Sequence, residues 1–336
     1  MNADTTEPAH GPDAVPGAEP DPPQRRPLWK RLVSPLLLGL VLVFVIVALQ
    51  RNWAAVRSEL DLLSVWDLVA ATAAVVGALI ATWLAWHLIL RHLGGRLAAH
   101  PSQVLFFSSQ VGKYVPGSVW PALIAARIGL ANGVPTPVAL GSYLLGMLVT
   151  VATGLLLTPL LLIERSDPTI VMIAVAGPCA GVTLLALAAH RGGLHRLAEW
   201  ASRRSGRSIP SPYLPPRVIV PIAGVQVVSW AFFGLHVWLL ARPLGTGVAD
   251  LLPVVAAFAL AFAAGLVVFP LPAGAGVREA VLMIALEPSI GRAGALSVAV
   301  LSRFVIIAAE LGVAAVVGVP HAIRAVKRGD SDDELL

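Results

Sequence analysis

The sequence predicts an all-α fold: a polytopic transmembrane helical bundle of seven to eight spans with two broken or re-entrant segments. Three observations lead to this prediction. Of the 336 residues, 57% are hydrophobic and 13% are charged, whereas a soluble domain carries about 25% charged residues. The apolar residues form runs of the length that crosses a bilayer, about 20 residues. Two stretches rich in Gly and Pro, each with basic side chains, interrupt these runs.

The apolar runs delimit a transmembrane domain, 32–320, between two cytoplasmic tails, 1–31 and 321–336. We expect disorder in the first tail, because it is rich in Pro and acidic residues and has no apolar period. No small-residue cleavage site follows the first run, which therefore predicts an uncleaved span rather than a signal peptide. Full spans are predicted at 32–49, 68–90, 136–163, 169–189, 218–241, 251–269 and 295–319.

The basic residues predict that both termini are cytoplasmic. With the amino terminus inside, 15 basic residues flank the spans on the cytoplasmic side and 5 on the other, as expected in the cytoplasmic membrane. An even number of crossings then needs an eighth, assigned to a short helix at 277–286 with its irregular flank. The polar loop 190–217 either fixes the topology as a solvated loop or forms a basic amphipathic helix at 192–204 that lies on headgroups.

The first broken segment, 108–127, combines charge with helix-breaking residues. The backbone groups freed by such a break need partners that lipid does not offer, so the break must pack in protein or line a wet cavity. Lys113 and Arg127 are costly to bury without an anionic partner. This segment therefore predicts a polar site inside the bundle. Its helix breakers are Gly112, Pro116 and Gly117.

The second broken segment, 269–279, repeats this pattern in the other half of the chain. Arg278 and Glu279 follow its breakers, and a helix that begins there would offer free N–H groups to an anion. One break in each half is typical of transporters whose discontinuous helices meet near the bilayer midplane. A phosphate or pyrophosphate is the natural ligand; the alternative is a pair of packing kinks with snorkelling charges. The breakers are Pro272, Gly274 and Gly276.

Arg303 and Glu310 lie seven residues apart on the last span, so they share roughly one helix face. They form either a polar stripe that faces the bundle interior or an internally neutralised pair that fixes packing. His87 and His236 also lie in spans, and we expect packed, hydrogen-bonding roles for both. No metal site or cofactor is predicted, and no protease, hydrolase or nucleotide-binding motif occurs, so enzymatic activity is less expected than transport. Nothing points to nucleic acid.

Residues 112–120 read G-K-Y-V-P-G-S-V-W, with Arg127 downstream. They resemble the G-K-Y-x-P-G-x-x-W…R stretch of the lysylphosphatidylglycerol synthase transmembrane domain family, also called flippase-like. Residues 272–279 resemble its P-G-G-x-G-x-R-E stretch, with Ala273 where a glycine is usual. The resemblance covers most of 32–320.

The resemblance implies an all-helical membrane module with re-entrant segments that handles lipids with polar headgroups. In bifunctional members a separate cytosolic domain makes the aminoacylated lipid, and the membrane part moves it across the bilayer. We expect no such synthesis here, since the sequence shows no such domain. Other members resemble proteins of glycan assembly on polyprenyl phosphates, which leaves the lipid open.

The hypothesis is therefore a flippase that moves a phospholipid or a polyprenyl-phosphate-linked sugar across the cytoplasmic membrane. The carboxylates would neutralise the empty site or couple movement to protons. The alternatives are a membrane-embedded transferase acting on a polyprenyl-phosphate sugar, with Glu279 as base, or a non-catalytic partner of a membrane glycosyltransferase of the cell envelope. The candidate substrate-binding residues are Lys113, Tyr114, Arg127, Arg278, Glu279, Arg303 and Glu310.

Overall fold

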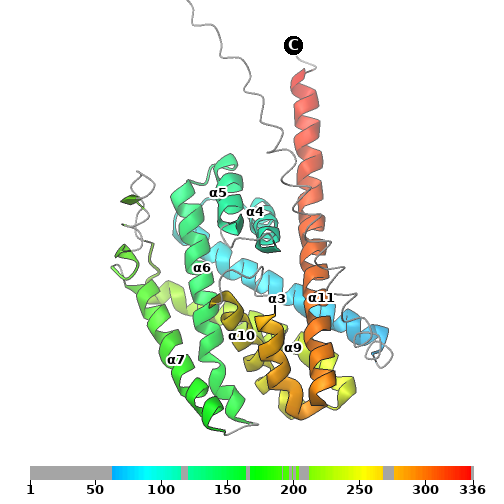
Figure 1. Cartoon of the computed structure of the whole chain (residues 1–336). Coiled ribbons are helices and arrows are strands. Elements are labelled where there is room, and N and C mark those ends of the chain that lie inside the picture. Colours follow the sequence, from blue (N-terminus) through cyan, green and yellow to red (C-terminus); the bar gives the residue numbers. More distant parts are fainter. Residues whose placement is uncertain are drawn as a thin grey trace, which may run out of the picture. The chain divides into compact units, whose positions relative to one another are not determined.

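A computed structural model describes residues 63–114, 120–163, 167–190, 192–196, 199, 202–203, 212–267 and 276–333, the last fifteen as backbone. These residues belong to one compact unit. Every regular element in the described part is a helix (Figure 1), so the all-α prediction is confirmed. The elements are α3 Val65–His92, α4 Ala99–Val111, η1 Gly112–Tyr114, α5 Trp120–Ala131, α6 Thr136–Leu156, η2 Thr158–Ile163, α7 Pro168–Ala189, α9 Pro216–Ala241, η3 Arg242–Leu244, η4 Val248–Asp250, α10 Leu251–Val267 and α11 Val277–Asp333.

Within the described residues, six helical stretches are long and apolar enough to cross a membrane. The chain is thus a multi-pass membrane protein. The predicted run 32–49 and the tail 1–31 lie outside the described residues, as does most of the loop 190–217. The six stretches are Val65–His92, Thr136–Ile163, Pro168–Ala189, Pro216–Leu244, Val248–Leu266 and Val277–Gly318.

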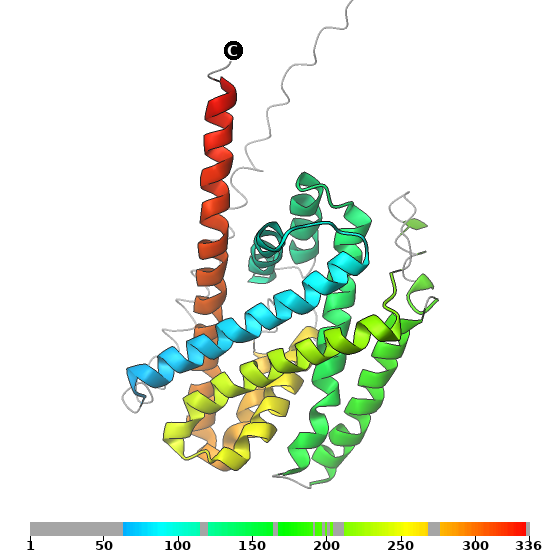
Figure 2. The same cartoon turned by 180° about the vertical axis from the view of Figure 1, so that it is seen from behind.

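Two long helices pack along each other. Along α3 and α9, Gly77 lies against Phe232, and the Thr82 and Ser229 hydroxyls are hydrogen-bonded at 2.7 Å. Near the ends, Arg242 approaches Asp67 at 3.8 Å. Residue numbers rise along one helix as they fall along the other, so α3 and α9 are antiparallel, and Figure 2 shows them side by side.

Ser229→Ala tests how much the hydrogen bonds between α3 and α9 contribute to stability. The Ser229 hydroxyl also bonds to the Ala78 carbonyl oxygen at 2.9 Å, so the substitution removes a buried polar link between the helices. Interhelical hydrogen bonds in membranes average about 0.6 kcal/mol, and we expect a loss of that size in unfolding free energy. Unfolding in mixed micelles measures it; a loss above about 2 kcal/mol would contradict the small value.

The first broken segment forms a re-entrant hairpin. α4 and α5 have 13 and 12 residues, or roughly 20 and 18 Å of helix, short of the ~30 Å hydrocarbon core. A Cβ on Gly112 would lie 2.8 Å from Ile124 Cδ1, and one on Gly129 would lie 3.5 Å from Leu105 Cδ1. The end of α4 therefore meets the start of α5, and the middle of α4 lies beside the end of α5. A glycine at 112 allows this close approach.

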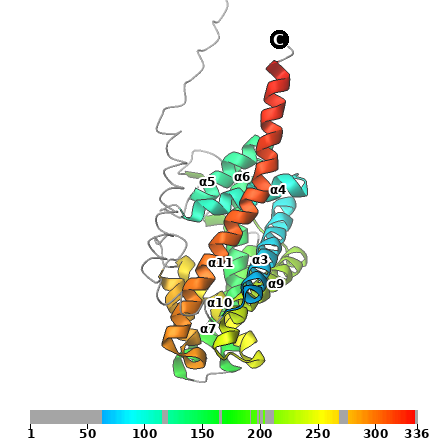
Figure 3. The same ribbon diagram turned by 90° about the vertical axis from the view of Figure 1, so that its right-hand side faces the viewer.

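The second broken segment is followed by a second reversal. In α11, Gly291 has φ 71° and ψ 166°, which interrupts the helix and turns the chain. The stretch 277–290 lies back along α10, where Arg278 contacts Phe258 and Phe262. After the turn, 292–333 returns past 277–290 and continues beside α3 and α4 (Figure 3). The short helix predicted at 277–286 is thus present and extends to 290.

The order of elements is repeated in the two halves. The order in each half is a long helix, a shorter helix, a break, a short helix, a glycine with positive φ and a long helix; it occurs first as α3 to α6 and again as α9 to α11, where the shorter helix α10 is itself long enough to span. The glycines are Gly133 (φ 76°) and Gly291 (φ 71°). Since α3 and α9 are antiparallel, the halves have inverted orientations, as in many transporters.

Two predicted span boundaries agree with the structure. The third span was predicted at 136–163, and the apolar stretch is Thr136–Ile163, in which the α-helix ends at Leu156 and the chain continues as the 3₁₀ helix η2. The last span was predicted to end at 319; the apolar stretch ends at Gly318, and the helix itself continues to Asp333.

Candidate functional site

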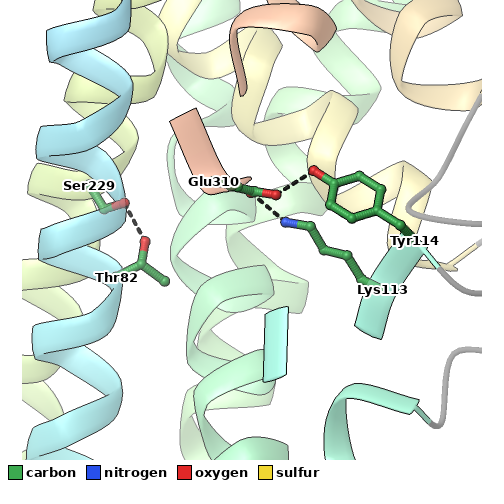
Figure 4. Close-up of polar contacts among 5 residues, drawn as sticks. All are labelled: Thr82, Lys113, Tyr114, Ser229 and Glu310. Carbon is green, nitrogen blue, oxygen red and sulfur yellow. Dashed lines mark hydrogen bonds and ion pairs between the residues drawn. The ribbon is translucent and has the colours of Figure 1, made fainter. Parts of the chain in front are cut away.

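The tip of the first hairpin contacts the last helix through Glu310. The Lys113 ammonium lies 2.5 Å from Glu310 Oε1, and the Tyr114 hydroxyl donates a hydrogen bond to Glu310 Oε2 (Figure 4). The Glu310 side chain is 7% exposed and that of Lys113 is 22% exposed. Both carboxylate oxygens therefore have donors, which is what a buried charge requires.

A second ion pair joins the two parts of α11. Arg303 Nη1 lies 3.5 Å from Glu279 Oε1, with both side chains mostly buried. Glu279 Oε2 accepts the Gly276 backbone N–H at 2.7 Å. We predicted free N–H groups for an anion at this helix start, but Glu279 itself supplies a carboxylate to one of them.

Arg278 lies against two aromatic rings. Its guanidinium carbon is 5.2 Å from the Phe258 ring centroid and 4.9 Å from that of Phe262, both on α10. A guanidinium within about 6 Å of a ring face is attracted to its quadrupole. The rings hold the cation at the site without neutralising its charge.

A small pocket lies between α10 and the two parts of α11. Its cavity volume is about 10 Å³, which is room for about one water molecule, so a headgroup that binds here must displace part of the lining. The polar lining of the pocket consists of Arg278, Glu279, Ser302 and Arg303.

The charged groups form one electrostatic cluster. Lys113 interacts with Glu310 and is repelled by Arg278 and Arg303, and Arg278 in turn is attracted by Glu279 and Glu310. The structure therefore brings residues of both broken segments together. Three cations and two carboxylates leave this group with a net charge of +1.

Arg303 and Glu310 do share a face toward the bundle interior, but they do not pair with each other. Their partners are Glu279 and Lys113 respectively. The interpretation as an internally neutralised Arg303–Glu310 pair is therefore wrong, and the polar stripe is correct.

Arg127 is exposed on α5 and takes no part in the contacts described above; its role in holding a phosphate stays a prediction. Of the helix breakers, Gly112 lies at the hairpin contact and Gly276 has φ 86°. The others lie outside the described residues: Pro116, Gly117, Pro272 and Gly274.

Sequence reasoning missed the aromatic and hydroxyl groups of the pocket. Phe258 and Phe262 are four residues apart, a spacing that puts them on one helix face, but nothing linked that face to Arg278. His236 Nε2 lies 2.8 Å from Ser302 Oγ, a contact across 66 residues that no local pattern signals. In the described part of the chain, no group of three or more His, Cys, Asp or Glu side chains could hold a metal ion.

The comparison with protein families agrees with this geometry. The model of the family described as "Lysylphosphatidylglycerol synthase TM region" matches residues 33–312. This match includes the α4–α5 hairpin, α10 with the stretch 277–290, and every charged residue of the cluster. A comparison with curated proteins finds no match. With most of its length matched, the chain belongs to the lysylphosphatidylglycerol synthase transmembrane-region family.

Proposed function

We propose that the protein binds a lipid with an anionic, phosphate-containing headgroup and moves it across the cytoplasmic membrane. The observation that carries the proposal is the cluster in which Lys113 from the first hairpin meets Arg278 and Arg303 from α11, beside a small pocket that both arginines line. Ionisable groups inside a membrane bundle are costly and mark substrate pathways.

The carboxylates indicate how the empty site is held. Glu310 accepts bonds from Lys113 and Tyr114, and Glu279 accepts one from the Gly276 N–H. These donors are the groups that a phosphate oxygen would use. A phosphodiester carries one negative charge, which would offset the net +1 of the cluster. We infer that the headgroup competes with the two carboxylates for the same donors.

The apolar part of the pocket lining supports a lipid rather than a soluble phosphate. It includes Phe258, Ala299 and Ile306, which suits the start of an acyl or prenyl chain. A lipid that places its headgroup here keeps its tails in the surrounding hydrocarbon. In transporters with inverted halves, the binding site opens first to one face of the membrane and then to the other, and we expect the same here.

Lys113→Ala and Arg278→Ala test this assignment. Each removes charge-assisted hydrogen bonds worth about 1.5–3 kcal/mol, so we expect the transport rate to fall roughly 10- to 100-fold. The measurement follows fluorescent phosphatidylglycerol across the bilayer of proteoliposomes. Arg242→Ala, which alters an exposed ion pair at the end of α9, is the matched control and should transport at the wild-type rate.

A second arm separates a lipid from a free phosphate. The same proteoliposomes are given radiolabelled glycerol 3-phosphate, which carries the phosphate without the tails. Uptake of the lipid alone supports the proposal. Uptake of the soluble phosphate alone, or wild-type lipid transport by both site variants, would overturn it.

A further inference from the structure

We propose that His236 and Ser302 form a proton-binding site coupled to the anion pocket, so that the headgroup enters together with one proton. This inference rests on the proposed function and adds the ion that accompanies the lipid. It also assigns a role to a buried histidine that sequence reasoning treated as packing.

The two side chains lie directly behind the pocket. Ser302 lines it on α11 beside Arg303. His236, on α9, is fully buried, and Ser302 is 2% exposed. His236 Nε2 and Ser302 Oγ are 2.8 Å apart. Ser302 therefore stands between the histidine and any ligand in the pocket.

The hydrogen bonds fix which atoms carry protons. His236 Nδ1 is in contact with the Phe233 carbonyl oxygen, and a carbonyl only accepts, so Nδ1 carries the hydrogen. In the neutral ring Nε2 is then an acceptor. Ser302 must donate its single hydroxyl hydrogen to Nε2. That hydrogen points away from the pocket, and the ligand side of Ser302 presents oxygen lone pairs.

An anion changes this arrangement. A phosphate oxygen next to Ser302 would face those lone pairs, which is unfavourable. If the hydroxyl turned to the anion instead, Nε2 would be left buried without a donor. A protonated His236 resolves both problems, because its Nε2–H donates to Ser302 Oγ and frees the hydroxyl hydrogen for the phosphate. Anion binding and proton binding therefore favour each other, as linked equilibria must.

The surrounding charges support the same coupling. The positive charge of Arg278 acts on His236, so it disfavours a second cation there while the pocket is empty. A bound phosphate offsets Arg278 and Arg303, and Glu279 is the carboxylate nearest to them in the pocket lining. The Phe258 ring of α10 meets the imidazole edge-on at 5.2 Å.

The helices α7 and α10 carry no Asp, Glu, His, Lys or Arg. On the other helices packed against α9, Asp67 pairs with Arg242, His87 stacks on Trp83, and Tyr143 is the only ionisable residue of α6.

The test counts protons taken up on binding. Dihexanoyl phosphatidylglycerol is titrated into the full-length protein in detergent, in two buffers of different ionisation enthalpy, by calorimetry. We expect the wild type to take up about one proton per lipid bound and its affinity to fall by about tenfold per pH unit in the range of uptake.

His236→Gln keeps an amide that reaches Ser302 but cannot titrate, so it should bind lipid with no proton uptake and no pH slope. His87→Gln alters the other buried histidine, which stacks on Trp83 away from the pocket, and should retain both. If His236→Gln does not fold, Ser302→Ala breaks the link and should lower uptake to less than half.

The outcomes separate this inference from the proposed function. Lipid binding with no proton uptake in the wild type, or with uptake unchanged in His236→Gln or Ser302→Ala, overturns the proton site alone. If the wild type binds no anionic lipid, both the proton site and the proposed function fall.

Discussion

Glu310→Ala is expected to lower the free energy of unfolding by about 3–5 kcal/mol, the usual cost of removing one partner of a buried ion pair. The substitution leaves the Lys113 ammonium and the Tyr114 hydroxyl without their shared acceptor. It also removes the polar link between the tip of the first hairpin and the last helix, so that this contact rests on the packing of Tyr114 against Ile307. Denaturation in mixed micelles, followed by circular dichroism, measures the loss.

Two further variants separate the charge from its contacts. In Lys113→Ala/Glu310→Ala no unpartnered charge stays behind, so the double variant should be less destabilised than the sum of the single ones. Glu199→Ala removes an exposed carboxylate that pairs with Arg203 at 3.4 Å, where about 0–1 kcal/mol is expected. A Glu310→Ala loss as small as that of Glu199→Ala would mean that the site is more hydrated than its burial indicates.

Gly234→Ala is expected to cost about 1–3 kcal/mol through overpacking. A Cβ at this position of α9 would lie 2.2 Å from Val255 Cγ2 and 2.4 Å from Val255 Cα. The backbone of α10 must therefore move, and α10 carries the Phe258 and Phe262 rings that hold Arg278. We expect weaker lipid transport in addition to lower stability.

Gly224→Ala on the same helix is the matched control. A Cβ there meets nothing within 4 Å, and Ala favours helix over Gly by about 1 kcal/mol. The control should therefore be neutral or stabilising in the same unfolding measurement. Equal losses in both variants would show that the contact between α9 and α10 does not decide the result.

The fold was largely predictable because a bilayer imposes a simple length and polarity requirement on each span. The same reasoning located both breaks, since Gly and Pro act locally on the backbone. It gave the end of the last apolar stretch to within one residue, but it could not give the end of the helix. Hydropathy reports where the hydrocarbon ends, whereas the helix continues while its residues favour helix, and those after 320 include Ala322, Ala325 and Lys327.

The pairing within the site was less predictable. Spacing along one helix left open whether Arg303 and Glu310 neutralise each other or form a polar stripe, and their ion-pair partners come from elsewhere in the fold. Lys113 and Glu310 are 197 residues apart, and their contact depends on how the first hairpin packs against α11. Local pattern identifies residues that are costly to bury, but the identity of their partners follows from tertiary packing.

The proton site beside the charged cluster has a consequence for the effect of membrane voltage. Moving one elementary charge across the whole membrane is worth about 2.3 kcal/mol per 100 mV. A monoanionic headgroup that crosses alone is therefore driven by the membrane potential. The same headgroup accompanied by a proton on His236 carries no net charge, and its transport is electroneutral.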